Sequence, residues 1–292
     1  MSDERGGRFA HDGHFWRRLA ALGAQNLPVW CIRYSPPFFG LAAAVAVPKA
    51  RRAVRRNLRR IRGEKSLYRD VIDTSRTFMA YAGSLAEILA YGSKNEGLAQ
   101  SEIIGTERMH EAVALGKGVL LLTLHTGGWE VAGPLFLGHI KLDVMLVMAA
   151  ERNAGARELQ DRAREAGGMK VAHVGDDPLA SLPLLRHLRQ KGAVAMQIDR
   201  PPPNGRVVPV RLLGEEDGSL PEGPFLLAQL SGAPLVAVFS MRRGFRDYYM
   251  EVSVPRTLPR RATPEQVREV AQGLADDVTE FLRAHPTQWF HW

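Results

Sequence analysis

Short apolar runs alternate with helical stretches from residue 118 to the end of the chain. The first run, 119–124 (VLLLTL), is continuous, which is typical of a parallel strand buried on both faces. Similar runs occur at 142–148, 169–174, 193–198 and 234–240. Helical stretches lie between several of them, at about 153–166, 178–190 and 222–231. This alternation predicts an α/β fold, with a central, mostly parallel or mixed sheet flanked by helices.

Three further segments complete the predicted domain. Residues 248–254 (YYMEVSV) alternate between apolar and polar positions, which favours an edge strand. Residues 264–284 have helical periodicity and begin with a proline after a threonine, a common start signal for a helix. Residues 66–92 also predict a helix. We therefore expect an N-terminal segment, 1–65, followed by a single α/β domain, 66–292.

The most apolar stretch of the chain is 26–47 (NLPVWCIRYSPPFFGLAAAVAV). A spanning helix needs about 20 mainly apolar residues, but Arg33 and the pair Pro36-Pro37 interrupt this run. We therefore expect an interfacial or hairpin-like contact with a membrane. A hairpin buried in the protein core is the alternative.

A basic segment follows the apolar stretch directly. Eight of the sixteen residues 48–63 (PKARRAVRRNLRRIRG) are Lys or Arg. Residues 1–70 carry a net charge of +10 and the remainder −2, against +8 for the whole chain. Anionic lipid headgroups, an acidic carrier protein or nucleic acid would suit such a segment, and a solvated helix face is the alternative. The lack of interleaved aromatic residues and of a reading motif disfavours nucleic acid.

Cysteine and histidine usage restricts the remaining classes of function. The single cysteine, Cys31, cannot form an intrachain disulfide, and the N-terminus lacks the apolar core of a secretory signal. We therefore expect a protein that faces the cytoplasm. Metal-binding spacings such as H-E-x-x-H or paired C-x-x-C are absent, so we expect neither a metal nor a cofactor.

Candidate catalytic residues follow the first strand, in the segment HTGGWE. His125 comes directly after the apolar run, and parallel strands of α/β sheets bind ligands beyond their carboxyl ends. Gly127 and Gly128 allow a tight turn and a close approach of substrate. The turn allows Glu130 to fold back, fix the imidazole tautomer and stabilise the imidazolium. A hydrogen-bonded core histidine and a carboxylate at a helix start are the alternative interpretation.

These residues are sufficient for acyl transfer to a hydroxyl. His125 would remove the proton from the attacking hydroxyl, a role that contributes about 10²–10⁴-fold to rate. Backbone N–H groups of the turn or of the helix start would stabilise the oxyanion. No G-x-S-x-G segment is present, and the mechanism needs no enzyme nucleophile.

The HTGGWE segment resembles the H-x4-[DE] motif of the lipid A late acyltransferase family, which includes relatives that acylate other glycolipids. Further segments resemble blocks of that family in the same order: RRAVRRNLRR (51–60), LRHLRQKGAVAMQIDR (185–200), LPEGPFLLAQLSGAPLVAVF (220–239) and HPTQWFHW (285–292). The resemblance covers almost the whole chain. It implies a glycerol-phosphate-acyltransferase-like fold, with His125 and Glu130 at the positions of the catalytic dyad.

The resemblance also implies partners and a location. Members transfer an acyl chain from acyl carrier protein, or from a CoA thioester, to a hydroxyl or acyl-hydroxyl of a lipid or glycolipid acceptor. They act at the cytoplasmic face of the cell inner membrane, where an anionic membrane surface would attract the basic segment. Arg200 follows Asp199 where lipid A enzymes commonly have glutamine, which is closer to the glycolipid-acylating relatives. The acceptor is therefore left open.

Other charged residues are candidates for the substrate site. Asp199 and Arg164 match an acidic and a basic position of the family and would line the site; a surface aspartate and an exposed helix arginine are the alternatives. Arg200 and Arg206 lie beside a proline-rich loop and suit bidentate pairing with phosphate, although solvated loop arginines are common.

Two rival functions remain at this stage. An acyl thioesterase would use the same histidine, with water in place of the acceptor hydroxyl. A non-enzymatic protein that binds anionic lipid or nucleic acid would use the basic segment alone.

Overall fold

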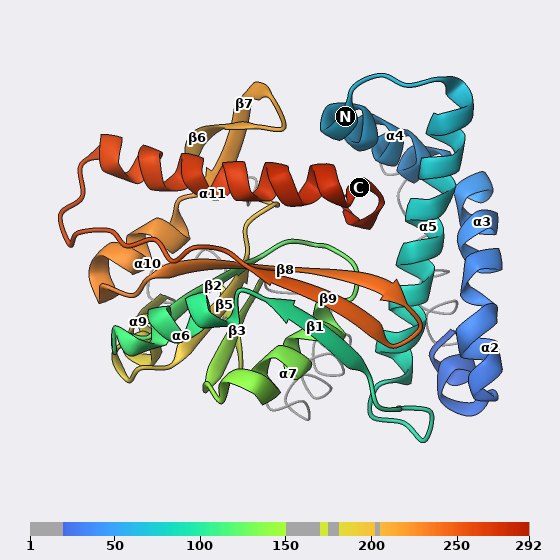
Figure 1. Cartoon of the computed structure of the whole chain (residues 1–292), viewed down its shortest axis with the longest axis horizontal. Coiled ribbons are helices and arrows are strands. Elements are labelled where there is room, and N and C mark those ends of the chain that lie inside the picture. The colour runs from blue at the N-terminus through green and yellow to red at the C-terminus, as the bar shows by residue number, and fades with distance from the viewer. Residues whose placement is uncertain (1–19, 150–169, 175–180, 202–204, 292) are drawn as a thin grey trace, which may run out of the picture.

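A seven-stranded sheet forms the centre of the protein (Figure 1). The computed structural model describes residues 20–149, 170–174, 181–201 and 205–291. In spatial order the strands are β1 (Gln100–Ile104), β9 (Asp247–Val252), β8 (Leu235–Gly244), β2 (Val119–Thr123), β5 (Ala193–Gln197), β3 (Val144–Ala149) and β4 (Lys170–Val174). Neighbouring strands are parallel except for the antiparallel pair β8 and β9. The predicted α/β fold with a mostly parallel, mixed sheet is therefore confirmed.

The central strand β2 is buried on both faces, as its continuous apolar sequence predicts. Leu120 and Leu122 pack into one core, to which α9 (Leu182–Arg189), α10 (Gly223–Ser231) and α11 (Pro264–Ala284) contribute. Val119 and Leu121 pack into a second core with α6 (Thr106–Ala114) and α7 (Trp129–Ile140). The period of two along a strand places alternate side chains in the two cores.

The C-terminal helix α11 has the start that its sequence predicts. Thr263 accepts a hydrogen bond from the backbone N–H of Gln266, and the Gln266 side chain accepts one from the backbone of Thr263. This reciprocal capping box satisfies two N–H groups that a helix start leaves unpaired. A short 3-10 helix, η2 (Pro286–Gln288), follows α11.

One expectation about strands was wrong, and some strands were not predicted. The segment predicted as an edge strand forms β9, which lies between β8 and β1, and β1 itself is an edge strand. The sequence did not predict β1, because this strand has only five residues (QSEII) and most of them are polar, so they form no apolar run. The acidic stretch after Leu212 forms a further strand that the sequence did not predict, β7 (Glu215–Pro221), which pairs antiparallel with β6 (Val207–Leu212). The helix expected at 153–166 lies outside the described residues.

Within the described residues, the helices α2 (Val29–Tyr34), α3 (Pro36–Ala46), α4 (Pro48–Arg62) and α5 (Leu67–Ala90) precede the sheet domain, and residues 20–26 are helical as well. Prolines interrupt the apolar stretch by starting new helices, because proline needs no intrahelical acceptor at a first position. α3 packs closely along α5, since a Cβ on Gly40 would lie 2.6 Å from the carbonyl oxygen of Phe78. The predicted helix at 66–92 is confirmed as α5.

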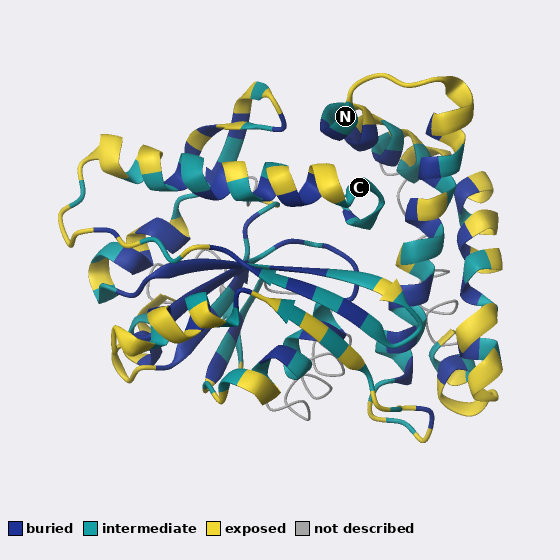
Figure 2. Ribbon diagram, viewed as in Figure 1, coloured by how far each residue is buried: buried dark blue, intermediate teal, exposed yellow. Residues whose placement is uncertain are grey.

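Many residues of α2 and α3 are exposed, as the yellow positions in Figure 2 show, and several of them are large and apolar. Phe38 is 72% exposed and Val45 is 76% exposed, and Trp30 and Phe39 are exposed as well. The alternative of a buried core hairpin is therefore wrong. Within the described part of the chain, no helix combines the length and the apolar character that crossing a bilayer requires. An exposed apolar surface of this kind is typical of an interaction site.

The buried carboxylate of Asp70 joins α4 to α5. It accepts hydrogen bonds from Arg59 at 2.9 and 3.0 Å and from Arg62 at 2.9 Å. Burial raises the pKa of Asp70, but the hydrogen bonds and positive charges of the two arginines outweigh it, so the pKa lies below its usual value. Asp70 therefore stays charged at neutral pH and holds the basic helix α4 against α5.

Candidate active site

The candidate site lies at the carboxyl ends of two neighbouring parallel strands. His125 follows β2 by two residues, and Asp199 follows β5 by two residues. β2 and β5 pair in register, with Thr123 opposite Gln197. Because parallel neighbours end at the same edge of the sheet, this register brings the two side chains together.

The imidazole of His125 is held by Asp199. Nδ1 of His125 lies 2.8 Å from Oδ1 of Asp199, and the backbone N–H of His125 donates to Oδ2 at 3.1 Å. A carboxylate only accepts, so Nδ1 carries the hydrogen and Nε2 keeps its lone pair. The histidine side chain is 25% exposed and the aspartate side chain 3% exposed. This is the arrangement of a general base supported by a buried carboxylate.

A third donor, the indole of Trp289, completes the environment of Asp199. Nε1 of Trp289 donates to Oδ2 of Asp199 at 2.9 Å. Burial raises the pKa of Asp199, but the hydrogen bonds and charge of His125 and the hydrogen bond from Trp289 outweigh it. The pKa of Asp199 therefore lies below its usual value, and the carboxylate is ionised at neutral pH.

The C-terminal segment 285–291, which we call the C-terminal strap, crosses this site. The backbone N–H of Phe290 donates to the carbonyl of His125 at 2.8 Å. Arg200 donates to the carbonyl of Phe290 at 2.7 Å, and Asn57 of α4 donates to the carbonyl of His291. The sequence did not reveal the contact of Trp289 with Asp199. The block HPTQWFHW was the available signal.

Two glycines shape the turn after His125. A Cβ on Gly127 would lie 2.1 Å from Oε1 of Gln288, in the strap. Gly128 has φ +75° and caps α7, and its Cβ would lie 2.2 Å from the ring of Tyr248. The space beside these two glycines is therefore filled by side chains of the protein itself, Gln288 and Tyr248. Their predicted contact with substrate stays a prediction.

Replacing Gly128 with alanine is expected to lower the stability of the fold and to displace His125. The left-handed φ costs an alanine about 1–2 kcal/mol, and the clash with Tyr248 adds about 1–3 kcal/mol of overpacking. Thermal unfolding of Gly128→Ala measures the loss. Gly138→Ala in the same helix is the control, because its Cβ meets nothing within 4 Å. Equal stability of the two variants would contradict this account of the turn.

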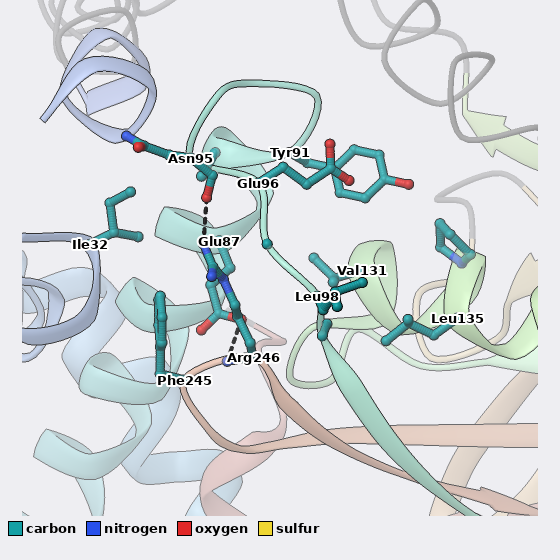
Figure 3. Close-up of a pocket in the computed structure, with 14 residues that line it drawn as sticks. Ile32, Glu87, Tyr91, Asn95, Glu96, Leu98, Val131, Leu135, Phe245 and Arg246 are labelled. Carbon is teal, nitrogen blue, oxygen red and sulfur yellow. Dashed lines mark hydrogen bonds between the residues drawn. The ribbon is translucent and has the colours of Figure 1, made fainter. Parts of the chain in front are cut away.

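A buried charge network supports the turn from behind. The carboxylate of Glu87 accepts hydrogen bonds from Arg242 at 2.7 Å, from the backbone of Arg246 at 3.1 Å and from the hydroxyl of Tyr248. Figure 3 shows Glu87 and Arg246 at the wall of a cavity of about 270 Å³. Burial and the charge of Glu87 raise the pKa of Tyr248, so its hydroxyl stays protonated. Because Glu87 holds Tyr248, whose ring packs against Gly128, we assign this network a supporting role.

An apolar cavity of about 70 Å³ lies between α7 and the sheet. Its lining includes Thr123 and Trp129, which flank His125 in the sequence, and Ala195 of β5. Further residues that line it are Leu121, Phe136, Leu146 and Val238. Such a cavity next to His125 suits an apolar part of a substrate.

The other predicted site residues are spread around this centre. Glu130 lies in the first turn of α7 and is half-buried, but Nδ1 of His125 is occupied by Asp199. Arg200 reaches the strap, whereas Arg206 is 88% exposed and pairs with Glu222 at 3.5 Å. Arg164 lies outside the described residues. No three potential metal ligands gather anywhere in the described ranges.

A comparison with known families identifies one match. A family model described as bacterial lipid A biosynthesis acyltransferase matches residues 16–292. The match spans the turn after β2, the end of β5 and the strap. No curated protein matches the chain.

Proposed function

The chain belongs to the bacterial lipid A biosynthesis acyltransferase family, and from this premise we propose that it is an O-acyltransferase that uses His125 as its general base. The acyl donor is a thioester of acyl carrier protein or CoA, and the acceptor is a hydroxyl of a lipid or glycolipid. One observation carries the proposal. Asp199 holds Nδ1 of His125 at 2.8 Å, which leaves Nε2 as the proton acceptor.

The reaction follows from this geometry. Nε2 of His125 takes the proton of the acceptor hydroxyl while the oxygen attacks the thioester carbonyl carbon. The tetrahedral intermediate collapses, the carbon–sulfur bond breaks, and the imidazolium returns the proton to the leaving thiolate. The products are an ester and a free thiol. Asp199 stabilises the imidazolium that forms between the two steps.

Two further groups support the charged intermediates in this proposal. Glu130 brings a second carboxylate near the ring, and its charge favours the imidazolium while Asp199 fixes the tautomer. The helix α7 begins at Trp129, four residues after His125. The N–H groups of a helix start lack intrahelical acceptors and favour negative charge, so they suit the oxyanion.

The apolar cavity under α7 suits the acyl chain. Replacing Ala195 with leucine is expected to shift the preference toward shorter acyl donors by about tenfold, because the larger side chain fills part of the cavity. Each methylene of the acyl chain that is no longer buried there costs about 0.8 kcal/mol of binding free energy. Rates with donors of several chain lengths measure the shift. Ala195→Val should give an intermediate shift. An unchanged chain-length profile in a folded Ala195→Leu variant would place the acyl chain elsewhere.

The N-terminal helices suit a peripheral contact with the cytoplasmic face of the inner membrane. The exposed side chains of α2 and α3 offer an apolar surface, and α4 follows with its arginines. Each cationic residue near an anionic leaflet contributes about 1 kcal/mol. The same positive charge would speed the encounter with an acidic acyl carrier protein.

The identity of the product tests the proposed function. Purified protein is incubated with labelled acyl carrier protein thioesters and a total bacterial lipid extract, and mass analysis identifies the product. We expect a labelled lipid ester. Labelled fatty acid alone would instead support a thioesterase. The absence of both products from a folded protein would favour a lipid-binding role.

A further inference from the structure

A groove lined with arginine lies where α4 faces the β6–β7 hairpin. It encloses about 460 Å³, and we call it the arginine groove. The residues that line it are Arg52, Arg55, Arg56, Arg59, Arg60 and Glu215. Figure 1 shows α4, the hairpin and α11 on the same side of the sheet.

The spacing of the arginines places them on one side of α4. Residues three or four positions apart, such as Arg52, Arg56 and Arg59, are neighbours on a helix surface. The opposite side of α4 carries Val54 and Leu58, which are buried against α3 and α5. The packing of α4 therefore fixes the arginines in the direction of the groove.

Carboxylates neutralise only part of this charge. Arg59 pairs with Asp70 at 2.9 Å, and Arg60 pairs with Glu215 at 2.5 Å. Across the described residues, no carboxylate forms an ion pair with Arg52, Arg55 or Arg56. The Nε atoms of Arg55 and Arg60 are also buried without an acceptor in this part of the chain. The groove therefore keeps a net positive charge that suits an anion.

The helix that carries the arginine groove also contacts the C-terminal strap. Asn57, from the same helix, donates to the carbonyl of His291 in the strap, and Trp289 of the strap donates to Asp199. Burial lowers the pKa of His291, and the positive charge of Arg60 lowers it further. Helix α4 and Asp199 therefore contact the same short segment.

We propose that the arginine groove binds a phosphate monoester carried by the acceptor lipid. This inference rests on the proposed function. Clustered guanidinium groups match the several oxygens of a phosphate monoester and pair with them bidentately. A lipid is the favoured source because α4 continues directly from α3, whose apolar side chains are exposed. A phosphate held there would present a nearby acceptor hydroxyl to His125.

Binding to vesicles tests the site without turnover. Wild-type protein and the double variant Arg55→Gln/Arg56→Gln are titrated with phosphatidylcholine vesicles that contain either phosphatidic acid, a monoester, or phosphatidylglycerol, a diester. We expect the double variant to lose about tenfold or more in affinity for the phosphatidic acid vesicles, because charge-assisted hydrogen bonds are lost. The loss on phosphatidylglycerol vesicles should be several-fold smaller.

Two controls separate a built site from general attraction and from the chemistry. Arg268→Gln is compared with the single variant Arg56→Gln, because each removes one positive charge. Arg268 lies on the exposed face of α11, where it pairs with Glu265, and its variant should bind as the wild type does. His125→Ala should also bind normally, so a failure of the proposed catalysis does not affect this test. Equal losses on both vesicle types, or an equal loss in Arg268→Gln, would overturn the proposal.

Steady-state kinetics identify the molecule that carries the phosphate. We expect Arg55→Gln/Arg56→Gln to raise KM for the acceptor lipid and to leave KM for the acyl donor unchanged. A rise confined to the donor would assign the groove to the phosphate of the donor and overturn the assignment to the acceptor. Arg56→Gln alone, at an exposed position, gives the same readout if the double variant folds poorly.

Discussion

Replacing His125 with alanine is expected to lower kcat by about 10²–10⁴-fold, the usual contribution of a positioned general base. Without Nε2, no group at this position accepts the proton of the attacking hydroxyl. The fold should persist, because Asp199 keeps its hydrogen bonds from the backbone N–H of residue 125 and from Trp289. Initial rates at saturating donor and acceptor, with circular dichroism of both proteins, measure the effect.

The matched control is His139→Ala. His139 lies near the end of α7 and is exposed, and its Nδ1 lies 2.8 Å from the carbonyl oxygen of Leu135. It should leave kcat unchanged. A folded His125→Ala variant with most of its turnover would contradict the assignment of the base.

The second large effect is expected for Asp199→Asn, which should lower kcat by about 10²–10⁴-fold. The carboxylate faces three donors: Nδ1 and the backbone N–H of His125, and Nε1 of Trp289. An asparagine has one oxygen, so its amide nitrogen would face one of these donors. The imidazole then loses its fixed tautomer, and the imidazolium loses its counter-charge.

Asp199 also makes stability depend on pH. Its pKa is lower in the folded protein than in the unfolded chain, so its stabilising contribution is complete above the unfolded value of about 3.9 and is lost as the pH falls through the folded value. The gap in stability between the wild type and Asp199→Asn should therefore narrow below about pH 4. Thermal unfolding across this range measures it. A constant gap would contradict the lowered pKa.

The variant Glu130→Gln tests which carboxylate, Glu130 or Asp199, is the main partner of His125. The sequence assigned the support of His125 to Glu130, whereas the structure places Asp199 at Nδ1. We expect Glu130→Gln to lower kcat less than Asp199→Asn does, since the tautomer stays fixed. The opposite order would restore Glu130 as the main partner of the histidine.

Local sequence signals predicted much of the fold but not its long-range pairs. The continuous apolar run at β2 and the proline start of α11 are local features, and both elements formed as expected. The contact between His125 and Asp199 joins residues 74 positions apart and depends on β5 lying next to β2. Spacing along the chain favoured Glu130, because it is near in sequence. The order of strands in the sheet brought Asp199 nearer.

The contribution of the C-terminal strap also depended on tertiary structure. From the sequence alone, Trp289 is interpreted as a residue that packs in the protein, because the neighbouring residues give no indication that its indole N–H has a polar partner. Its indole reaches Asp199 because Phe290 pairs with the backbone of His125 and Arg200 holds the carbonyl of Phe290. The resemblance of the block to the family was a signal of importance, but it did not indicate the contact.

The central claim is that the protein transfers an acyl group to a lipid hydroxyl with His125 as base. The most direct test follows the consumption of a labelled acyl thioester by the wild-type protein, with and without acceptor lipid. We predict that the acceptor accelerates consumption and that the label lost from the thioester appears in equal amount in a lipid ester. Consumption at the same rate without acceptor, with the label recovered as free fatty acid, would contradict the account.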